Sequence, residues 1–162
     1  MKKASLIFAI LLTSWFQTYG QGLGLTFQEA HIQGITIKHL DSLYKSALHS
    51  DSSLAVFKTQ KEQEAMTQAY VEMLQDFGKF LNKNNFSWDK PTKCFNRIYF
   101  NSDGTIDYFL FNFLGNKEEK PSKEKEIEFQ ELLNFFISDY KFSLTADTKF
   151  SQCSPTTYMN KQ

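Results

Sequence analysis

The densest apolar segment of the chain runs from residue 93 to residue 113, with aromatic residues on both sides of a short polar break. The break, residues 101–105, reads Asn-Ser-Asp-Gly-Thr, which is typical of a type I turn closed by a glycine in the left-handed region. The flanking segments, residues 94–101 and 105–114, are rich in Phe, Tyr and Ile, as β-strands are. This pattern predicts a β-hairpin.

Both faces of the predicted hairpin carry apolar residues. If Asn101 lies opposite Thr105, one face carries Ile98, Phe100, Ile106, Tyr108 and Leu110. The other face then carries Phe95, Arg97, Tyr99, Phe109, Phe111 and Phe113. A hairpin with one face in water alternates apolar with polar residues, and neither face here is polar throughout. We therefore expect both faces to be covered, at least in part.

Two helices are predicted before the hairpin. Apolar residues recur in steps of three and four over residues 27–49, although Gly34 and the β-branched residues after it weaken the first half. Residues 54–81 carry the longest stripe, which consists of Ala65, Met66, Ala69, Tyr70, Met73, Leu74, Phe77, Phe80 and Leu81. Such a stripe buries against another element. We expect the helical residues 27–82 to pack as an antiparallel helical hairpin.

A further helix and a third strand are predicted after the hairpin. Pro121 and Ser122 indicate the start of the helix, and residues 141–146 then resemble a strand, with residues 150–162 as a tail. The predicted fold class is α+β, with an N-terminal helical hairpin followed by a β-hairpin, a helix and a third strand in a three-stranded, mainly antiparallel sheet. The ββαβ half covers residues 92–154.

The first 20 residues are typical of a secretory signal peptide that is cleaved. A basic start precedes an apolar run over residues 4–15, and Thr18 and Gly20 occupy the −3 and −1 positions before Gln21, with cleavage after Gly22 as the alternative. The run is shorter than the roughly 20 residues that a membrane-spanning helix needs. We expect an exported protein, periplasmic or extracellular, in which residues 21–162 form a single α+β domain.

The balanced charge of the chain argues against a nucleic-acid partner. The chain has 18 Lys and Arg against 18 Asp and Glu. Because nucleic-acid binding needs clustered positive charge, we expect no nucleic-acid partner. No segment after residue 20 is long and apolar enough to span a bilayer, which predicts no stable membrane insertion after signal cleavage.

The two cysteines, Cys94 and Cys153, suggest a disulfide, because an exported protein enters a compartment where disulfides persist. The predicted topology agrees, since the third strand would finish at the end of the sheet where the first strand begins. The alternative is a pair of buried free thiols. The spacing of the two residues fits neither a zinc site nor a CxxC redox motif.

No group of residues predicts catalysis, and we expect no metal and no cofactor. His31 and His39 lack the carboxylate or cysteine that would complete a metal-binding set. The turn at residues 101–107 resembles part of a calcium loop, but a full loop needs more ligands and a final glutamate. The sequence also has no Gly-x-Ser-x-Gly motif of a serine hydrolase, which favours a non-enzymatic role. Whether the protein is an enzyme stays open.

One resemblance to a known family comes from the second half of the chain. A strand ending in NSDGTI, a second strand, the helix EFQELLNFF and the strand KFSLTA make residues 92–154 similar to the C-terminal domain of TonB-type energy transducers. The resemblance implies a periplasmic module that binds protein. No functional residue is carried over from it.

Two functional hypotheses follow. The first is an exported, soluble, non-enzymatic module that binds a protein or peptide at the edge of its sheet, because extended segments add to exposed strand edges. The second is a small-ligand-binding protein or hydrolase with a pocket between the helices and the aromatic sheet. An open strand edge would favour the first hypothesis, and a deep pocket with convergent titratable groups would favour the second.

Overall fold

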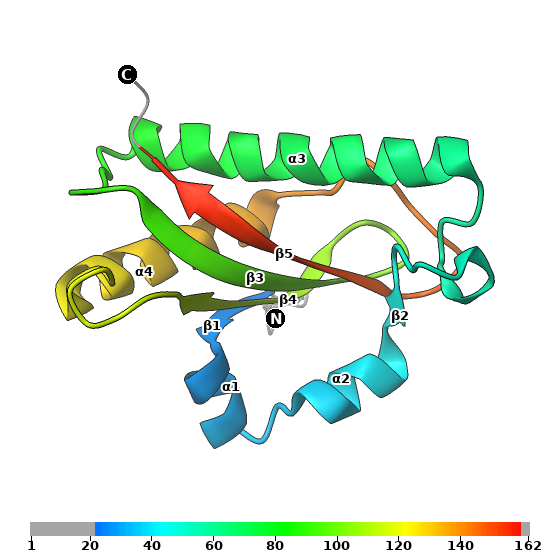
Figure 1. Ribbon diagram of the computed structural model, residues 1–162, viewed down its shortest axis with the longest axis horizontal. Helices are drawn as coiled ribbons and strands as arrows, with labels where there is room; N and C mark the ends of the chain where they lie inside the picture. Colours follow the sequence, from blue (N-terminus) through cyan, green and yellow to red (C-terminus); the bar gives the residue numbers. More distant parts are fainter. Residues whose placement is uncertain (1–21, 160–162) are drawn as a thin grey trace, which may run out of the picture.

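The computed structural model describes residues 22–159 (Figure 1). The elements are β1 (Leu23–Thr26), α1 (Phe27–Ile32), α2 (Ile37–Leu43), β2 (Lys45–Ser46), a 3-10 turn (Ser52–Leu54), α3 (Gln60–Lys83), β3 (Thr92–Phe100), β4 (Ile106–Phe113), α4 (Lys123–Asp139) and β5 (Phe150–Tyr158). The predicted signal peptide, residues 1–20, lies outside the described residues. Within them, no helix has the length and apolar character that a bilayer crossing requires.

The five strands form one mixed sheet in the order β1-β4-β3-β5-β2. β3 is central and pairs antiparallel with both β4 and β5. The two short strands pair in parallel at the margins, β1 with β4 and β2 with β5. The predicted α+β class is therefore confirmed, but the sheet has five strands and not three.

The third strand of the predicted sheet was misplaced along the chain. Residues 141–146 form a loop that lies against the hairpin turn, where the Phe142 amide donates to the Gly104 carbonyl at 2.9 Å and the Ala146 amide to the Ser102 carbonyl at 3.0 Å. The Phe142 ring packs on Phe100 with centroids 4.6 Å apart. The strand is formed instead by the segment predicted as a tail.

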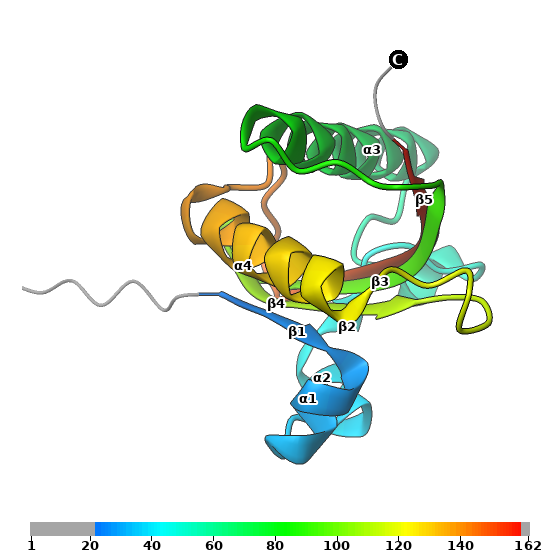
Figure 2. The same ribbon diagram turned by 90° about the vertical axis from the view of Figure 1, so that its left-hand side faces the viewer.

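Helices cover both faces of the sheet. Figure 2 shows α3 and α4 on one side, called here the upper face, and α1 and α2 on the other, called the lower face. The predicted antiparallel helical hairpin is therefore wrong, because the sheet separates α1 and α2 from α3. Gly34, with φ +78°, also divides the first predicted helix into two short ones.

Local sequence explains where the helices begin. The Thr26 and Thr59 hydroxyls accept hydrogen bonds from the backbone amides of Glu29 and Glu62, and each glutamate side chain accepts from the threonine amide in return. These capping boxes satisfy backbone amides that the first turn leaves unpaired. Ser122 caps α4 in the simpler way, by accepting from the Lys125 amide, which confirms the helix start predicted after Pro121.

The predicted β-hairpin is confirmed, including its glycine in the left-handed region. The Asn101 amide donates to the Thr105 carbonyl at 2.8 Å, and Gly104 has φ +89°. The register, however, shifts at Tyr99/Phe100, and Asp107 is left as the extra residue of a β-bulge. The bulge reverses the predicted faces of β4 from Tyr108 onward.

As a result, the upper face collects Ile98, Phe100, Ile106, Phe109, Phe111 and Phe113. Tyr99 and Leu110 lie on the lower face with Leu25, Ala30, Leu40 and Tyr44. The prediction that both faces of the hairpin are covered is confirmed, because each face carries its own buried cluster.

Aromatic rings dominate the larger, upper cluster. Phe129 of α4 is fully buried, and its ring centroid lies 5.1 Å from Phe111, 5.3 Å from Trp88 and 5.4 Å from Phe77. These residues come from four different segments of the chain. Their rings therefore join α3, α4 and the sheet into one core.

Removing one of these rings should destabilise the whole fold. Phe111→Ala should lower the free energy of unfolding by about 3–5 kcal/mol, because it leaves a cavity where a fully buried ring was. Lys117→Ala, at an exposed loop position, should change it by less than about 0.5 kcal/mol. Urea denaturation of both variants measures the difference. A Phe111→Ala variant as stable as the wild type would contradict the described core.

Candidate functional site

A polar cluster surrounds Asp107 at the bulge. The Asp107 carboxylate accepts hydrogen bonds from the Tyr44 hydroxyl at 2.5 Å, the Lys149 ammonium at 2.9 Å and the Asn101 amide at 2.5 Å. Burial, and then the neighbouring Asp107 carboxylate, raise the pKa of Tyr44 well above its usual range, so that the hydroxyl stays protonated. The polar groups of this cluster form hydrogen bonds with one another, and these bonds hold α2 and the start of β5 against the hairpin.

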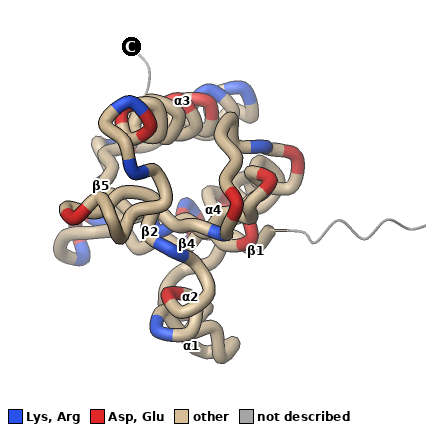
Figure 3. Tube along the Cα trace, turned by 90° about the vertical axis from the view of Figure 1, so that its right-hand side faces the viewer, with Lys and Arg blue, Asp and Glu red and all other residues tan. Residues whose placement is uncertain are grey.

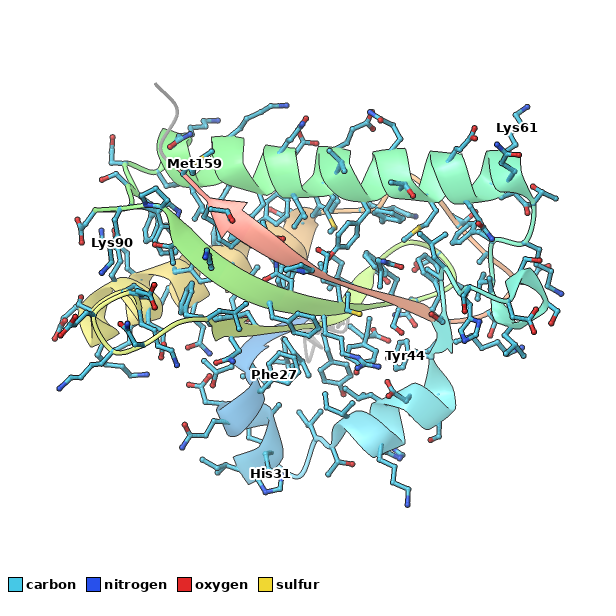
Figure 4. All side chains as sticks on the ribbon, viewed as in Figure 1. Phe27, His31, Tyr44, Lys61, Lys90 and Met159 are labelled. Atoms are coloured by element: carbon cyan, nitrogen blue, oxygen red, sulfur yellow. The ribbon has the colours of Figure 1, made fainter. Side chains whose placement is uncertain are left out.

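The candidate metal ligands are not brought together. His31 and His39 are both exposed, and Figure 4 shows His31 on the side of α1 that faces away from the sheet. In the turn, Asp103 accepts hydrogen bonds from the Thr105 amide and hydroxyl, while Asp107 is engaged in the cluster above. Among residues 22–159, no three His, Cys, Asp or Glu side chains are grouped so that they could hold a metal ion.

The predicted Cys94–Cys153 disulfide is not formed, and both thiols are free. Because the third strand is β5, Cys153 lies within it opposite Arg97, whereas Cys94 lies opposite Thr156. The two cysteines are thus three ladder positions apart, about 10 Å along the strands, which is beyond bridging distance. They also lie on opposite faces, Cys94 buried in the upper cluster and Cys153 exposed below.

The two edges of the sheet differ in whether their backbone groups have hydrogen-bond partners, and this difference identifies the candidate site. At the β1 edge, the Gly24 amide donates to the Asn134 side-chain oxygen at 2.8 Å. The Gly24 carbonyl accepts from the side-chain amides of Asn134 and Gln130, each at 3.1 Å. Side chains of α4 therefore satisfy the groups that a neighbouring strand would use. The β1 edge is closed at this position.

The β5 edge is open beyond its first two residues. β2 covers only Phe150 and Ser151, and the sheet has no further strand on that side within the described residues. The Ser151 carbonyl accepts from the Ala47 amide, so odd-numbered residues of β5 direct their backbone groups toward this edge. The same alternation places the backbone groups of Cys153, Pro155 and Thr157 there. The Cys153 carbonyl accepts a hydrogen bond from the Gln152 side-chain amide at 3.2 Å, and Pro155 has no N–H to offer.

The opposite strand supports this assignment. Lys93 lies opposite Thr157, and its carbonyl accepts from the Leu114 amide on the β4 side. Lys93 therefore does not use its carbonyl toward β5, as expected for a non-hydrogen-bonded pair. The backbone groups of Thr157 consequently face away from β3 and toward the open edge.

A groove runs between this edge and α3, and we call it the strand-edge groove. Two adjoining hollows, one of about 570 Å³ and one of about 390 Å³, share Val71, Leu74 and Thr156 in their walls. Gly78 and Asn82 of α3 continue the wall toward the C-terminal end of β5. Figure 4 shows Met159 at this end of the groove, beside α3.

The strand-edge groove is apolar and almost uncharged. Val71 is 41% exposed and Met159 66% exposed, although both are large hydrophobic residues. β5 contains no charged residue. Lys79 lines the groove, but its ammonium pairs with Asp76 at 2.8 Å. Elsewhere, Lys and Arg are interspersed with Asp and Glu along the trace, as Figure 3 shows.

Packing among residues 22–159 does not require a glycine at position 78. Gly78 lies inside α3, where glycine costs about 1 kcal/mol relative to alanine. A Cβ at Gly78 would meet no heavy atom of a non-neighbouring residue within 4 Å among the described residues. The absent side chain therefore leaves space on the groove side of the helix, where another backbone can approach closely.

Comparison with family models, with curated proteins and with solved structures finds no match to this chain. The candidate site therefore depends on the geometry alone. β5 and the groove were not predicted from the sequence, although it carries two signals: a segment of nine residues without charge, FSQCSPTTY, and a glycine in the middle of a long helix.

The two thiols should differ sharply in reactivity. Burial raises the pKa of Cys94 to about 12, so this thiol is both covered and protonated at neutral pH, whereas Cys153 is exposed. Alkylation of the native protein at pH 8 should label Cys153 alone, and alkylation in denaturant should label both. Mass spectrometry counts the labels. Two labels on the native protein, or none on the denatured protein without reductant, would contradict the described thiols.

Proposed function

We propose that the protein is an exported module that binds an extended segment of another protein or peptide by strand addition to β5. The observation that carries the proposal is the difference between the two sheet edges. α4 closes β1 with amide side chains, whereas β5 leaves backbone donors and acceptors open next to an apolar groove. In strand addition, main-chain hydrogen bonds supply affinity and adjacent pockets select side chains.

The groove also indicates which segment would fit. An added strand places alternate side chains on the α3 side of the sheet. There they would meet Val71, Leu74 and Met159, which favour apolar residues at every second position. The lack of unpaired charge in the walls favours a segment that is itself uncharged. Export is proposed from residues 1–20, and the resemblance to TonB-type C-terminal domains implies the same class of function.

The alternative, a small-ligand pocket between the helices and the sheet, has less support. The space between α3, α4 and the upper face is filled by rings such as Phe77, Phe111 and Phe129, which are fully buried. The titratable groups around Asp107 satisfy one another at the hairpin. Neither feature provides the deep polar pocket that this alternative requires.

A matched pair of substitutions at Thr157 tests strand addition. Random displayed peptides selected on the immobilised protein supply the probes. Thr157→Pro removes the outward N–H and should weaken binding of the selected peptides at least tenfold, whereas Thr157→Val keeps the N–H and should bind like the wild type. Thermal melting of both variants shows that the fold persists. Equal binding by the proline and valine variants would place the peptides elsewhere and reject the proposal.

Gly78→Ala should separate stability from binding. The substitution should raise the free energy of unfolding by up to about 1 kcal/mol, because alanine favours the helix and its methyl meets no clash. It should weaken peptide binding, since the same methyl occupies the space open to a partner. Glu72→Ala, on the exposed face of α3, serves as control and should leave binding unchanged. Denaturation and peptide titration give the two readouts. Tighter or unchanged binding by Gly78→Ala would argue against the groove.

A further inference from the structure

The open β5 edge is complementary to itself. Two identical strands paired antiparallel present the same donors and acceptors to each other around a two-fold axis. No charge on β5 opposes such an approach. Natural sheet edges are commonly protected by lysines, prolines or inward-pointing charges, and among these β5 has only Pro155.

We propose that, until a partner strand occupies the edge, two copies of this chain close it by pairing β5 antiparallel with β5 of the second copy. This inference rests on the proposed function, because it assigns the same edge to a resting dimer that a partner strand must displace. The two five-stranded sheets become one continuous sheet, with α3 of both copies on the same face.

Pro155 sets the register of the pair. If two prolines lay opposite each other, the centre of the ladder would have acceptors and no donors. A register centred on Thr156 instead places each Pro155 opposite Thr157 of the second copy, whose N–H donates to the proline carbonyl. In this register Cys153 lies opposite Met159 of the second copy, so the described length of the open edge is paired.

The rest of the sheet explains why association stops at two copies. After pairing, the outer edges of the joined sheet are the two β1 strands. Each is closed at Gly24 by Asn134 and Gln130, so no further copy can add there. A closed two-fold dimer is the expected assembly, because both open edges are used in one isologous contact.

The α3 helices favour the same arrangement. Val71 and Leu74 lie on the groove side of α3 and would face the second copy across the dimer axis. Gly78 leaves a gap in the helix surface at this level, and small residues allow two backbones to approach closely. The apolar surface exposed in one copy would be covered by the other.

Sedimentation and spin labelling test the dimer. The purified protein should sediment with twice the mass of the chain, Thr157→Pro should sediment as a monomer, and Thr157→Val as a dimer. Cys153 is the exposed thiol and its side chain points to the lower face, so a nitroxide there reports on register without blocking the edge. Electron paramagnetic resonance should give two labels about 20 Å apart, because each lies three residues from the centre of the ladder.

Selected peptides should dissociate the dimer, because they compete for the same β5 edge.

The outcomes separate this inference from the proposed function. A monomer that still binds selected peptides in a Thr157-dependent manner overturns the dimer and leaves strand addition intact. A monomer that binds no peptide overturns both. A dimer that persists in Thr157→Pro, or one with labels far from 20 Å, uses another surface and also overturns the inference.

Discussion

The structure depends on burying an aromatic hairpin on both of its faces. β3 and β4 carry rings above and below, so a helical layer on one side alone would leave the other in water. α3 and α4 meet the upper rings, and the short helices α1 and α2 meet Tyr99 and Leu110 below. The order of the elements follows from this constraint, because the chain must pass to both sides of one sheet.

Covering the two faces leaves the edges as the remaining problem. Backbone groups at a sheet edge must be satisfied by side chains, by water or by another strand. The chain satisfies Gly24 with two amide side chains from a helix that already packs on the sheet. Beyond Ser151 of β5, the described residues supply one weaker counterpart, the hydrogen bond from the Gln152 side-chain amide to the Cys153 carbonyl at 3.2 Å. The candidate site thus lies where the backbone groups of the sheet edge are no longer paired, and its position does not depend on a catalytic residue.

Hydrophobic pattern predicted which residues are buried better than it predicted where they pack. The turn at Gly104 was predicted correctly, and so was most of the stripe on α3, although Ala65 is exposed and the helix begins at Gln60 and not at residue 54. The partner of α1 and α2 was not, because an apolar face specifies burial but does not say which of two equivalent surfaces it covers. The bulge at Asp107 was also invisible, since an extra residue leaves no compositional mark yet reverses every later side chain.

β5 was missed for a different reason. Its inward residues include Ser154 and Thr156, whose hydroxyls form hydrogen bonds with Tyr70 and Asn96, so the strand lacks the apolar alternation that is typical of a half-buried strand. Residues 141–146 show better alternation, but Phe142 and Leu144 pack there from a loop. Misplacing this strand also produced the incorrect disulfide. An edge strand with hydroxyl side chains and a proline is recognisable only from its neighbours.

The separation of β3 and β5 along the chain has a consequence for folding. β3 is the central strand, yet one whole side of it is completed by a strand that follows only after β4 and α4. Until β5 is in place, a folding chain can form the β3–β4 hairpin but keeps β3 as an unpaired edge rich in Phe, Tyr and Ile. Such an edge attracts other unfinished chains and chaperones. A premature stop before Phe150 would therefore leave β3, the central strand of the sheet, with an exposed edge that is prone to aggregation.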